Sequence, residues 1–128
     1  GDVYKRQKEY VESTLKRLSE LGPSKVVLTG VAFDGRQVGS ASYDRSTDEI
    51  SYALSDTVDG YFHGTGDVFA SALLGAYMNG LSLAESARIA VDYTHGCIVR
   101  TKEAGTDLRY GVDFEHGIPD LLRQTGII

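Results

Sequence analysis

The stretch YFHGTGDVFASALLGAYMNG, residues 61–80, decides how the chain is interpreted, because a glycine-rich segment is followed directly by apolar residues at helical spacing. In Gly64-Thr65-Gly66-Asp67, two glycines flank a threonine and an aspartate follows at once. From Asp67 onward apolar residues recur at helical spacing and share one face, at Val68, Phe69, Ala72, Leu73 and Ala76. The stretch therefore predicts a glycine turn that opens directly into a helix over Asp67–Asn79.

The chemistry of such a turn favours anion binding. The first turn of a helix leaves backbone N–H groups without partners, and the aligned peptide dipoles add about half a positive charge there. Glycines let an anion approach the backbone closely. We therefore expect a phosphate-sized anion hole, with Asp67 placed to remove a proton from an attacking hydroxyl. The alternative is a simple glycine turn in which Asp67 complements the helix dipole.

The helix that follows is lined with small residues, among them Ala70, Ser71 and Gly75. Glycine costs roughly 1 kcal/mol relative to alanine in a helix interior, so Gly75 predicts a close backbone contact. We expect a central, buried helix that packs on a sheet and opens its N-terminus into a cleft.

The residues before the turn predict a helix and three strands. Apolar spacing indicates a helix over Lys8–Leu21, which Gly22-Pro23 would end. The β-branched run within Lys25–Thr29 predicts a buried, central strand. Two further strands, Gln37–Tyr43 and Glu49–Leu54, would form a hairpin.

The residues after the turn predict helices only. Ser82 and Glu85 have the spacing of a capping box, so a helix should begin there. Lys102–Leu108 is expected to be a loop, and Asp113–Gln124 a last helix that Pro119 interrupts or starts. The fold class is thus α/β, with a few-stranded sheet that contains a hairpin and is followed by C-terminal helices. Three strands cannot cover these helices, so we expect part of a larger domain, poorly stable alone.

Composition excludes several classes of protein. The 128 residues fit one domain, 41% of them are hydrophobic, and the formal net charge is -5. That charge argues against nucleic-acid binding, and no apolar run has the length of a membrane span. The single cysteine, Cys97, cannot form an internal disulfide, which suggests a reducing cytoplasm and a packed core thiol. The three histidines lack metal-ligand spacing, so no metal site is expected.

Residues His63–Ser71 resemble the anion-hole motif of the ribokinase-like superfamily, and most of all its vitamin B6 kinase branch. Val27–Val31 is similar to the strand and loop that this family uses near ATP, and Tyr110–Glu115 resembles its C-terminal segment. The resemblance covers residues 8–128, which would be the C-terminal part of a Rossmann-like kinase domain. Residues 1–7 match no part of the family and are expected to be a leader or an artefact.

The resemblance implies ATP-dependent phosphorylation of the 5'-hydroxymethyl group of pyridoxal, pyridoxine or pyridoxamine, in the salvage of pyridoxal 5'-phosphate. Asp67 would be the catalytic base and would lie beside the substrate. The residues that the resemblance places at ATP and its phosphates are Gly64, Thr65, Gly66, Thr29 and Gly30.

The resemblance also implies partners. The protein would use ATP with Mg²⁺, whose ligands are expected in an N-terminal half that this sequence lacks, so the chain alone should be inactive. Its partners would be a small-molecule B6 vitamer and ATP, with neither nucleic acid nor membrane. The full-length form is expected to be a cytoplasmic homodimer.

Four alternatives remain open. Hydroxymethylpyrimidine kinases share a similar motif but typically have cysteine where this chain has Asp67. Sugar kinases of the superfamily more often have alanine at the position of Thr65. A non-catalytic phosphate- or nucleotide-binding module would keep the anion hole without needing Asp67. An inert, truncated product is the last alternative.

Overall fold

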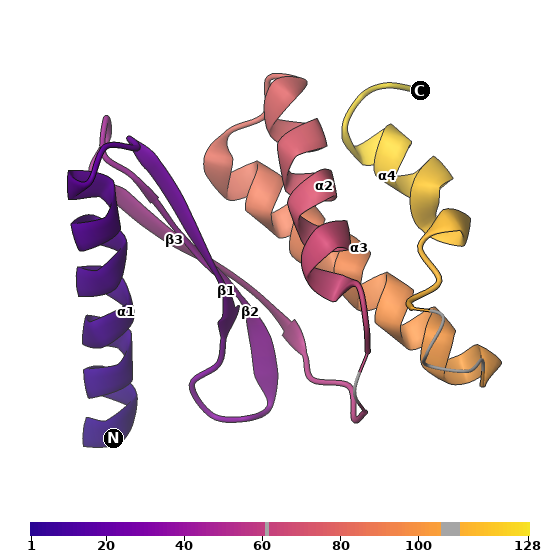
Figure 1. Ribbon diagram of the computed structural model, residues 1–128, viewed down its shortest axis with the longest axis horizontal. Coiled ribbons are helices and arrows are strands. Elements are labelled where there is room, and N and C mark those ends of the chain that lie inside the picture. Colours follow the sequence, from indigo (N-terminus) through magenta and orange to yellow (C-terminus); the bar gives the residue numbers. More distant parts are fainter. Residues whose placement is uncertain (61, 106–110) are drawn as a thin grey trace. The chain divides into compact units, whose positions relative to one another are not determined.

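The computed structural model describes residues 1–60, 62–105 and 111–128, which form two compact units, Gly1–Thr57 and Val58–Ile128 (Figure 1). The first unit consists of α1 (Asp2–Glu20), β1 (Lys25–Val31), β2 (Gln37–Asp44) and β3 (Glu49–Asp56). The second consists of α2 (Thr65–Met78), α3 (Leu83–Ala104), the 3₁₀ helix η2 (Glu115–Gly117) and α4 (Ile118–Gln124). None of the helices described is both long and apolar enough to cross a membrane.

The three strands form one antiparallel sheet in the order β1-β2-β3. The predicted hairpin is confirmed, and its strands pair from Gln37 opposite Asp56 to Asp44 opposite Glu49. At the end of β1 the register shifts between Thr29 and Val31, so Gly30 forms a bulge. The α/β fold class expected from the sequence is therefore correct.

The position of β1 differs from the expectation. We expected the strand within Lys25–Thr29 to be central, but in the described sheet it pairs with β2 alone and lies at an edge. Its apolar run is only half-buried, and Val26 and Leu28 pack against the buried cluster of this unit. A short β-branched run indicates that a strand contacts a core, but it does not specify how many neighbours the strand has.

The core of the first unit lies between α1 and the sheet, which run side by side in Figure 1. Ala41 and Tyr43 alternate along β2 and therefore share one face, where they meet Leu15 of α1. Leu15 has no exposed surface. A hydrogen bond of 2.7 Å from the Tyr52 hydroxyl to Glu12 Oε2 joins α1 to β3. The apolar spacing within Lys8–Leu21 thus predicted the packed positions Val11 and Leu15 correctly, whereas Leu21, on the same predicted face, is 83% exposed.

The start of α1 also differs from the expectation. The periodic apolar positions predicted a helix from Lys8, whereas α1 begins at Asp2 and includes most of residues 1–7. Val3 and Tyr4 are exposed at 69% and 46%. Because this first part of the helix buries no apolar face, hydrophobic periodicity could not detect it.

The second unit contains helices only. α2 buries Phe69, Ala72 and Ala76, which belong to the apolar face predicted from the sequence. α3 buries Ala87, Ala90 and Cys97 among others, and the two helices pack on each other. The capping box is confirmed in its first half, because the Ser82 hydroxyl oxygen accepts a 3.1 Å hydrogen bond from the Glu85 amide. α3 then runs on to Ala104, and its left-handed cap is Gly105.

Two expectations for α2 are wrong. The helix is not buried all round, because Leu74 and Met78 are exposed at 59% and 76%. Gly75 makes no close backbone contact, since a Cβ added there would meet nothing within 4 Å. The expected packing of this helix on the sheet involves both units and stays a prediction.

The C-terminal segment follows the sequence expectation in part. A 3₁₀ turn precedes α4, and Pro119 lies in the first turn of α4, so proline starts this helix. The predicted loop Lys102–Leu108 is wrong up to Ala104, which is helical. Residues 106–108 of that loop, together with Tyr110 and Tyr61, lie outside the described residues.

Two glycine-to-alanine substitutions test this packing with opposite signs. Gly75→Ala should stabilise α2 by about 1 kcal/mol, because alanine is the better helix former and the site is open. Gly39→Ala should strongly destabilise the hairpin, because its Cβ would lie 1.9 Å from the Ala53 carbonyl oxygen. Amide hydrogen exchange reports on each unit separately. Loss of protection in α2 of Gly75→Ala would contradict the open site.

Candidate phosphate-binding site

The glycine turn enters α2 through an unusual backbone conformation. Gly64 is the N-cap residue and has φ 83° and ψ 4°, the left-handed region that side chains disfavour. Its carbonyl oxygen accepts the first bond of the helix, 3.0 Å from the Val68 nitrogen. Gly64 has no side chain, and no side-chain hydrogen bond caps the helix. The first-turn amides of α2 are thus not covered by a capping side chain.

Within the described part of the chain, the surface around the two glycines of the turn is open. A Cβ added at Gly64 or Gly66 would meet no heavy atom within 4 Å. Gly64, Gly66 and Asp67 are exposed, and Thr65 is half-buried. The structure therefore brings the four motif residues together at one exposed helix N-terminus. This is the geometry in which backbone N–H groups and the helix dipole can bind an anion.

Asp67 lies in the first turn of α2. Among the described residues it forms no hydrogen bond or ion pair, in contrast to Asp44 and Asp113, whose carboxylates both have partners. An unengaged carboxylate at the positive end of a helix can accept a proton from a bound hydroxyl. It can also simply complement the dipole, so the geometry is compatible with both alternatives left by the sequence.

A backbone hydrogen bond from the C-terminal part of the chain holds the residue that precedes the turn. The Val112 amide donates a 3.2 Å hydrogen bond to the carbonyl oxygen of His63, the residue directly before Gly64. Val112 is 7% exposed, and Gly111 precedes it with φ 83°. The sequence marks residues 111–115 only by the family resemblance and by the helix expected from Asp113, and neither predicts a role at the turn. Within one sequence, nothing signals that their backbone contacts residue 63.

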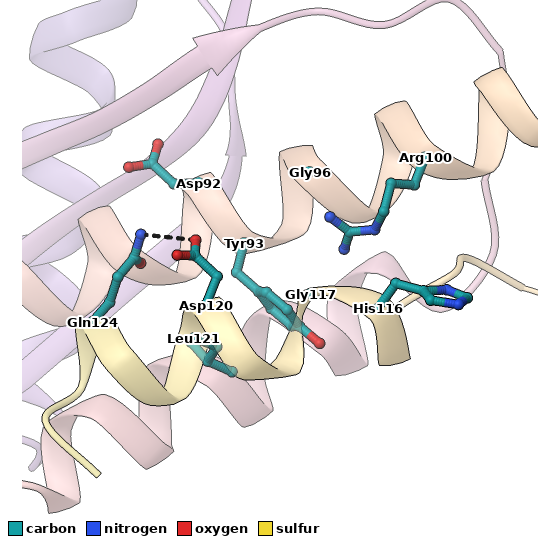
Figure 2. A pocket seen from close by; sticks show the side chains of 9 residues that line it. All are labelled: Asp92, Tyr93, Gly96, Arg100, His116, Gly117, Asp120, Leu121 and Gln124. Carbon is teal, nitrogen blue, oxygen red and sulfur yellow. Dashed lines mark hydrogen bonds between the residues drawn. The ribbon is translucent and has the colours of Figure 1, made fainter. Parts of the chain in front are cut away.

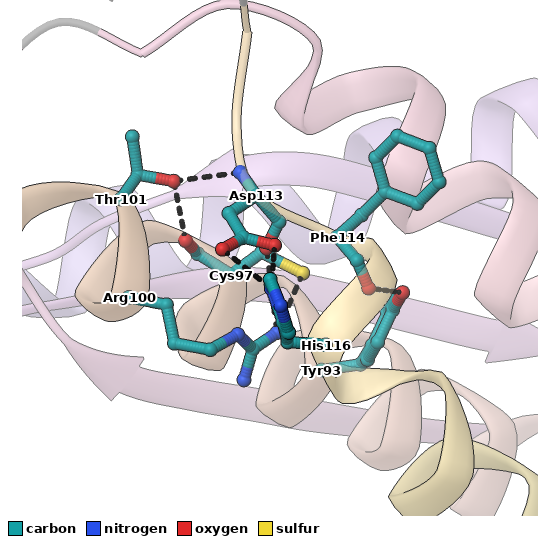
Figure 3. A network of polar contacts seen from close by, with 7 residues as sticks. All are labelled: Tyr93, Cys97, Arg100, Thr101, Asp113, Phe114 and His116. Atoms are coloured by element: carbon teal, nitrogen blue, oxygen red, sulfur yellow. Dashed lines mark hydrogen bonds and ion pairs between the residues drawn. The ribbon is translucent and has the colours of Figure 1, made fainter. Parts of the chain in front are cut away.

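A polar network joins the same segment to α3 (Figure 3). The Asp113 amide donates to Thr101 Oγ1 at 2.7 Å, and the Tyr93 hydroxyl donates to the Phe114 carbonyl oxygen. His116 Nδ1 lies 2.9 Å from both carboxylate oxygens of Asp113, and this hydrogen bond holds the pKa of Asp113 below its usual value. The network fixes residues 112–116 on the helix.

Cys97 belongs to this network and confirms the expectation of a packed core thiol. It has no exposed surface, and burial raises the pKa of its thiol. Arg100 Nη2 lies 3.3 Å from its sulfur and 3.4 Å from the Asp113 carbonyl oxygen. A thiol with a raised pKa is a poor nucleophile, so Cys97 has a structural role here.

A separate pocket of about 170 Å³ lies between α3 and α4 (Figure 2). Asp92 and Asp120 both line it, but Arg88 binds the first at 2.6 Å and Gln124 the second at 3.3 Å. Arg100 lines the same pocket, and its Nε atom is buried without a partner. Because its carboxylates are already engaged within the protein, this pocket is less suited to a ligand than the open turn.

Thr29 and Gly30, the other predicted nucleotide contacts, lie in the first unit. Both are exposed at the bulge that ends β1, where Gly30 has φ 69°. They line an open cleft of about 570 Å³ together with Tyr10 of α1 and Phe33. The structure thus places these two residues at a concave surface, whereas the motif residues 64–67 belong to the second unit.

Metal-ligating side chains do not cluster in the described part of the chain. Across residues 1–60, 62–105 and 111–128, no three His, Cys, Asp or Glu side chains gather in a group that could hold a metal ion. Mg²⁺ prefers several oxygen ligands, including carboxylates and phosphates.

Comparisons with known proteins identify the family of the chain. A family model described as phosphomethylpyrimidine kinase matches residues 2–111, a range that begins inside the segment 1–7. Pyridoxal kinase from Lactobacillus plantarum is 25% identical, with a TM-score of 0.78 over 88% of this chain and 41% of that chain. No match was found among curated proteins.

A Bacteroides thetaiotaomicron protein, provisionally described as a phosphomethylpyrimidine kinase, is similar in two crystal forms. Both are 26% identical and cover 89% of this chain, with TM-scores of 0.84 and 0.81. The second form contains pyridoxal. The chain spans only about two fifths of the length of these solved structures, 39% to 41%.

The fold is that of part of a ribokinase-like kinase domain. Because the family model matches most of the sequence, the chain belongs to the phosphomethylpyrimidine kinase family.

Proposed function

We propose that residues 8–128 belong to one kinase domain that uses ATP to phosphorylate the 5'-hydroxymethyl group of pyridoxal, pyridoxine or pyridoxamine. The observation that carries this proposal is the uncapped, open N-terminus of α2, with Asp67 in its first turn. Family membership supplies the kinase chemistry, and the residue at position 67 supplies the preference for a B6 vitamer.

The proposed roles follow from the geometry of the turn. Phosphoryl transfer needs mainly positioning and stabilisation of negative charge. The amides of Gly64, Thr65 and Gly66 would hold the transferring phosphoryl group, since no side chain competes for this space. Asp67 would accept the proton of the attacking hydroxyl. Thr29 and Gly30 would contact the nucleotide from the cleft of the first unit.

A second candidate is hydroxymethylpyrimidine kinase, which the description of the matching family model favours. The two functions differ at position 67, where this chain has aspartate and hydroxymethylpyrimidine kinases typically have cysteine. Aspartate is a stronger acceptor than an uncharged thiol, so it suits direct deprotonation of a hydroxyl. The similarity to a pyridoxal kinase and to a structure crystallised with pyridoxal also supports the B6 vitamer.

The phosphate-binding role can be tested on the chain as it stands. Phosphate should shift the amide NMR signals of Thr65 and Gly66, because the turn directs its free donors to one spot. Gly66→Val should abolish these shifts by placing side-chain atoms where the anion approaches.

Gly75→Val is the matched control, because Gly75 lies in the same helix and an added Cβ is equally unobstructed there. It carries the same cost of valine in a helix but leaves the turn open, so it should bind phosphate like the parent chain. If both variants respond to phosphate as the parent does, the anion does not bind at this turn.

The catalytic role of Asp67 needs a protein in which the chain is completed to the length of its relatives. Asp67→Asn keeps the size of the side chain but cannot accept the proton. It should lower kcat for pyridoxal by roughly 10²- to 10⁴-fold and leave the KM for ATP nearly unchanged, since the backbone amides remain. Steady-state kinetics measures both constants.

If Asp67 only complements the dipole of α2, a different result is expected for the same variant. Asp67→Asn would then lose roughly 0.3–1 kcal/mol of stability and turn over almost normally. A melting curve recorded beside the kinetics separates the two. Turnover within a few-fold of the parent protein would show that Asp67 is not the base.

A further inference from the structure

We propose that Thr101 is a positioning residue for the phosphate-binding turn and acts through Val112 and His63. This inference rests on the proposed function, because it assigns a support to the turn that would hold the phosphoryl group. Thr101 lies on α3, far along the sequence from Gly64, and its hydrogen bonds go to Cys97 and Asp113.

The first link is the Thr101 hydroxyl. It accepts a 2.7 Å hydrogen bond from the Asp113 amide and donates one of 2.7 Å to the Cys97 carbonyl oxygen of its own helix (Figure 3). Thr101 is only 1% exposed. Donation to Cys97 fixes the direction of the hydroxyl hydrogen, so its oxygen is free to accept from Asp113. Without this acceptor the part-buried Asp113 amide would be left unsatisfied, which is costly.

The second link is the neighbouring amide. Val112 directly precedes Asp113, and its N–H donates to the His63 carbonyl oxygen at 3.2 Å. Two consecutive amides of one short segment thus bind two different elements, with α3 on one side and the entrance of the glycine turn on the other. A Cβ added at Gly111 would lie 3.6 Å from the same His63 oxygen, so the segment passes close to the turn.

The third link is the turn itself. His63 is bonded directly to Gly64, whose left-handed conformation sets the direction in which α2 begins. Glycine has wide conformational freedom, so the sequence of the turn does not by itself fix this geometry. The bond from Val112 restricts the peptide that enters Gly64. Displacements of about 1 Å at a binding site can cost large factors in rate, so such a restraint has functional consequences.

Thr101→Val tests the link, because valine keeps the shape of the side chain and removes the hydroxyl. It should speed amide hydrogen exchange at Val112 and Asp113 and move the amide NMR signals of Thr65 and Gly66 without any ligand. It should also raise the Kd for inorganic phosphate by about 2- to 30-fold, the range seen for residues that couple to a site without touching it.

Two further variants separate positioning from general loss of stability. Thr101→Ser retains the hydroxyl and should restore the parent signals and the parent Kd. Thr94→Val is the matched control on the same helix, since the Thr94 hydroxyl donates only to its own helix, to the Ala90 carbonyl oxygen at 2.7 Å. It should leave Val112, Thr65 and Gly66 unchanged. Unchanged signals of Thr65 and Gly66 in a folded Thr101→Val protein would overturn the proposal.

A measurement on the parent chain covers the case in which Thr101→Val does not fold. Coupling between two sites is reciprocal, so bound phosphate should slow amide exchange at Val112 and Asp113. If phosphate binds the turn but does not change this exchange, the coupling of the turn to Val112 and Asp113 is refuted, whereas the phosphate-binding role of the turn is not. If phosphate does not bind the parent chain, the proposed function fails, whereas the ligand-free signals of Thr65 and Gly66 in the variants still decide the role of Thr101.

Discussion

The left-handed backbone of Gly64 is the constraint on which the candidate site depends. Its φ of 83° lets the chain turn directly into α2. Because Gly64 has no side chain, it cannot cap the helix with a side-chain hydrogen bond. A residue with a Cβ would pay roughly 1–2 kcal/mol for the same conformation. The consequence is a helix whose first turn faces open space with backbone donors and an acidic side chain. The proposed anion site and the proposed role of Asp67 as a base both depend on these features.

Two kinds of contact surround this turn: the packing of α2 on α3, and a backbone hydrogen bond from the C-terminal segment. α2 and α3 bury a common face of small and apolar residues, and the segment that follows residue 110 returns to residue 63. Thr101 ties this returning segment to α3, together with Tyr93 and Arg100 of the same helix. In the second unit, α3, the C-terminal segment and the glycine turn are therefore connected through a short chain of hydrogen bonds.

The sequence predicted those features that depend on local chemistry. Ser82 and Glu85 marked the start of α3, Pro119 marked α4, and the two strands expected within residues 37–54 form the hairpin of β2 and β3. Features that depend on distant partners were missed. Gly75 suggested a contact that does not exist, and the strand within Lys25–Thr29 lies at an edge instead of the centre. No pattern in the sequence indicates the contact between Val112 and His63.

The central claim is that the amides of residues 64–66 hold the phosphoryl group that is transferred. A crystal structure with bound nucleotide, of a protein in which the chain is completed to the length of its relatives, tests it most directly. The account predicts a terminal phosphate oxygen within about 3 Å of the amide nitrogens of Thr65 and Gly66. A nucleotide whose terminal phosphate binds elsewhere, with the turn empty, would contradict it.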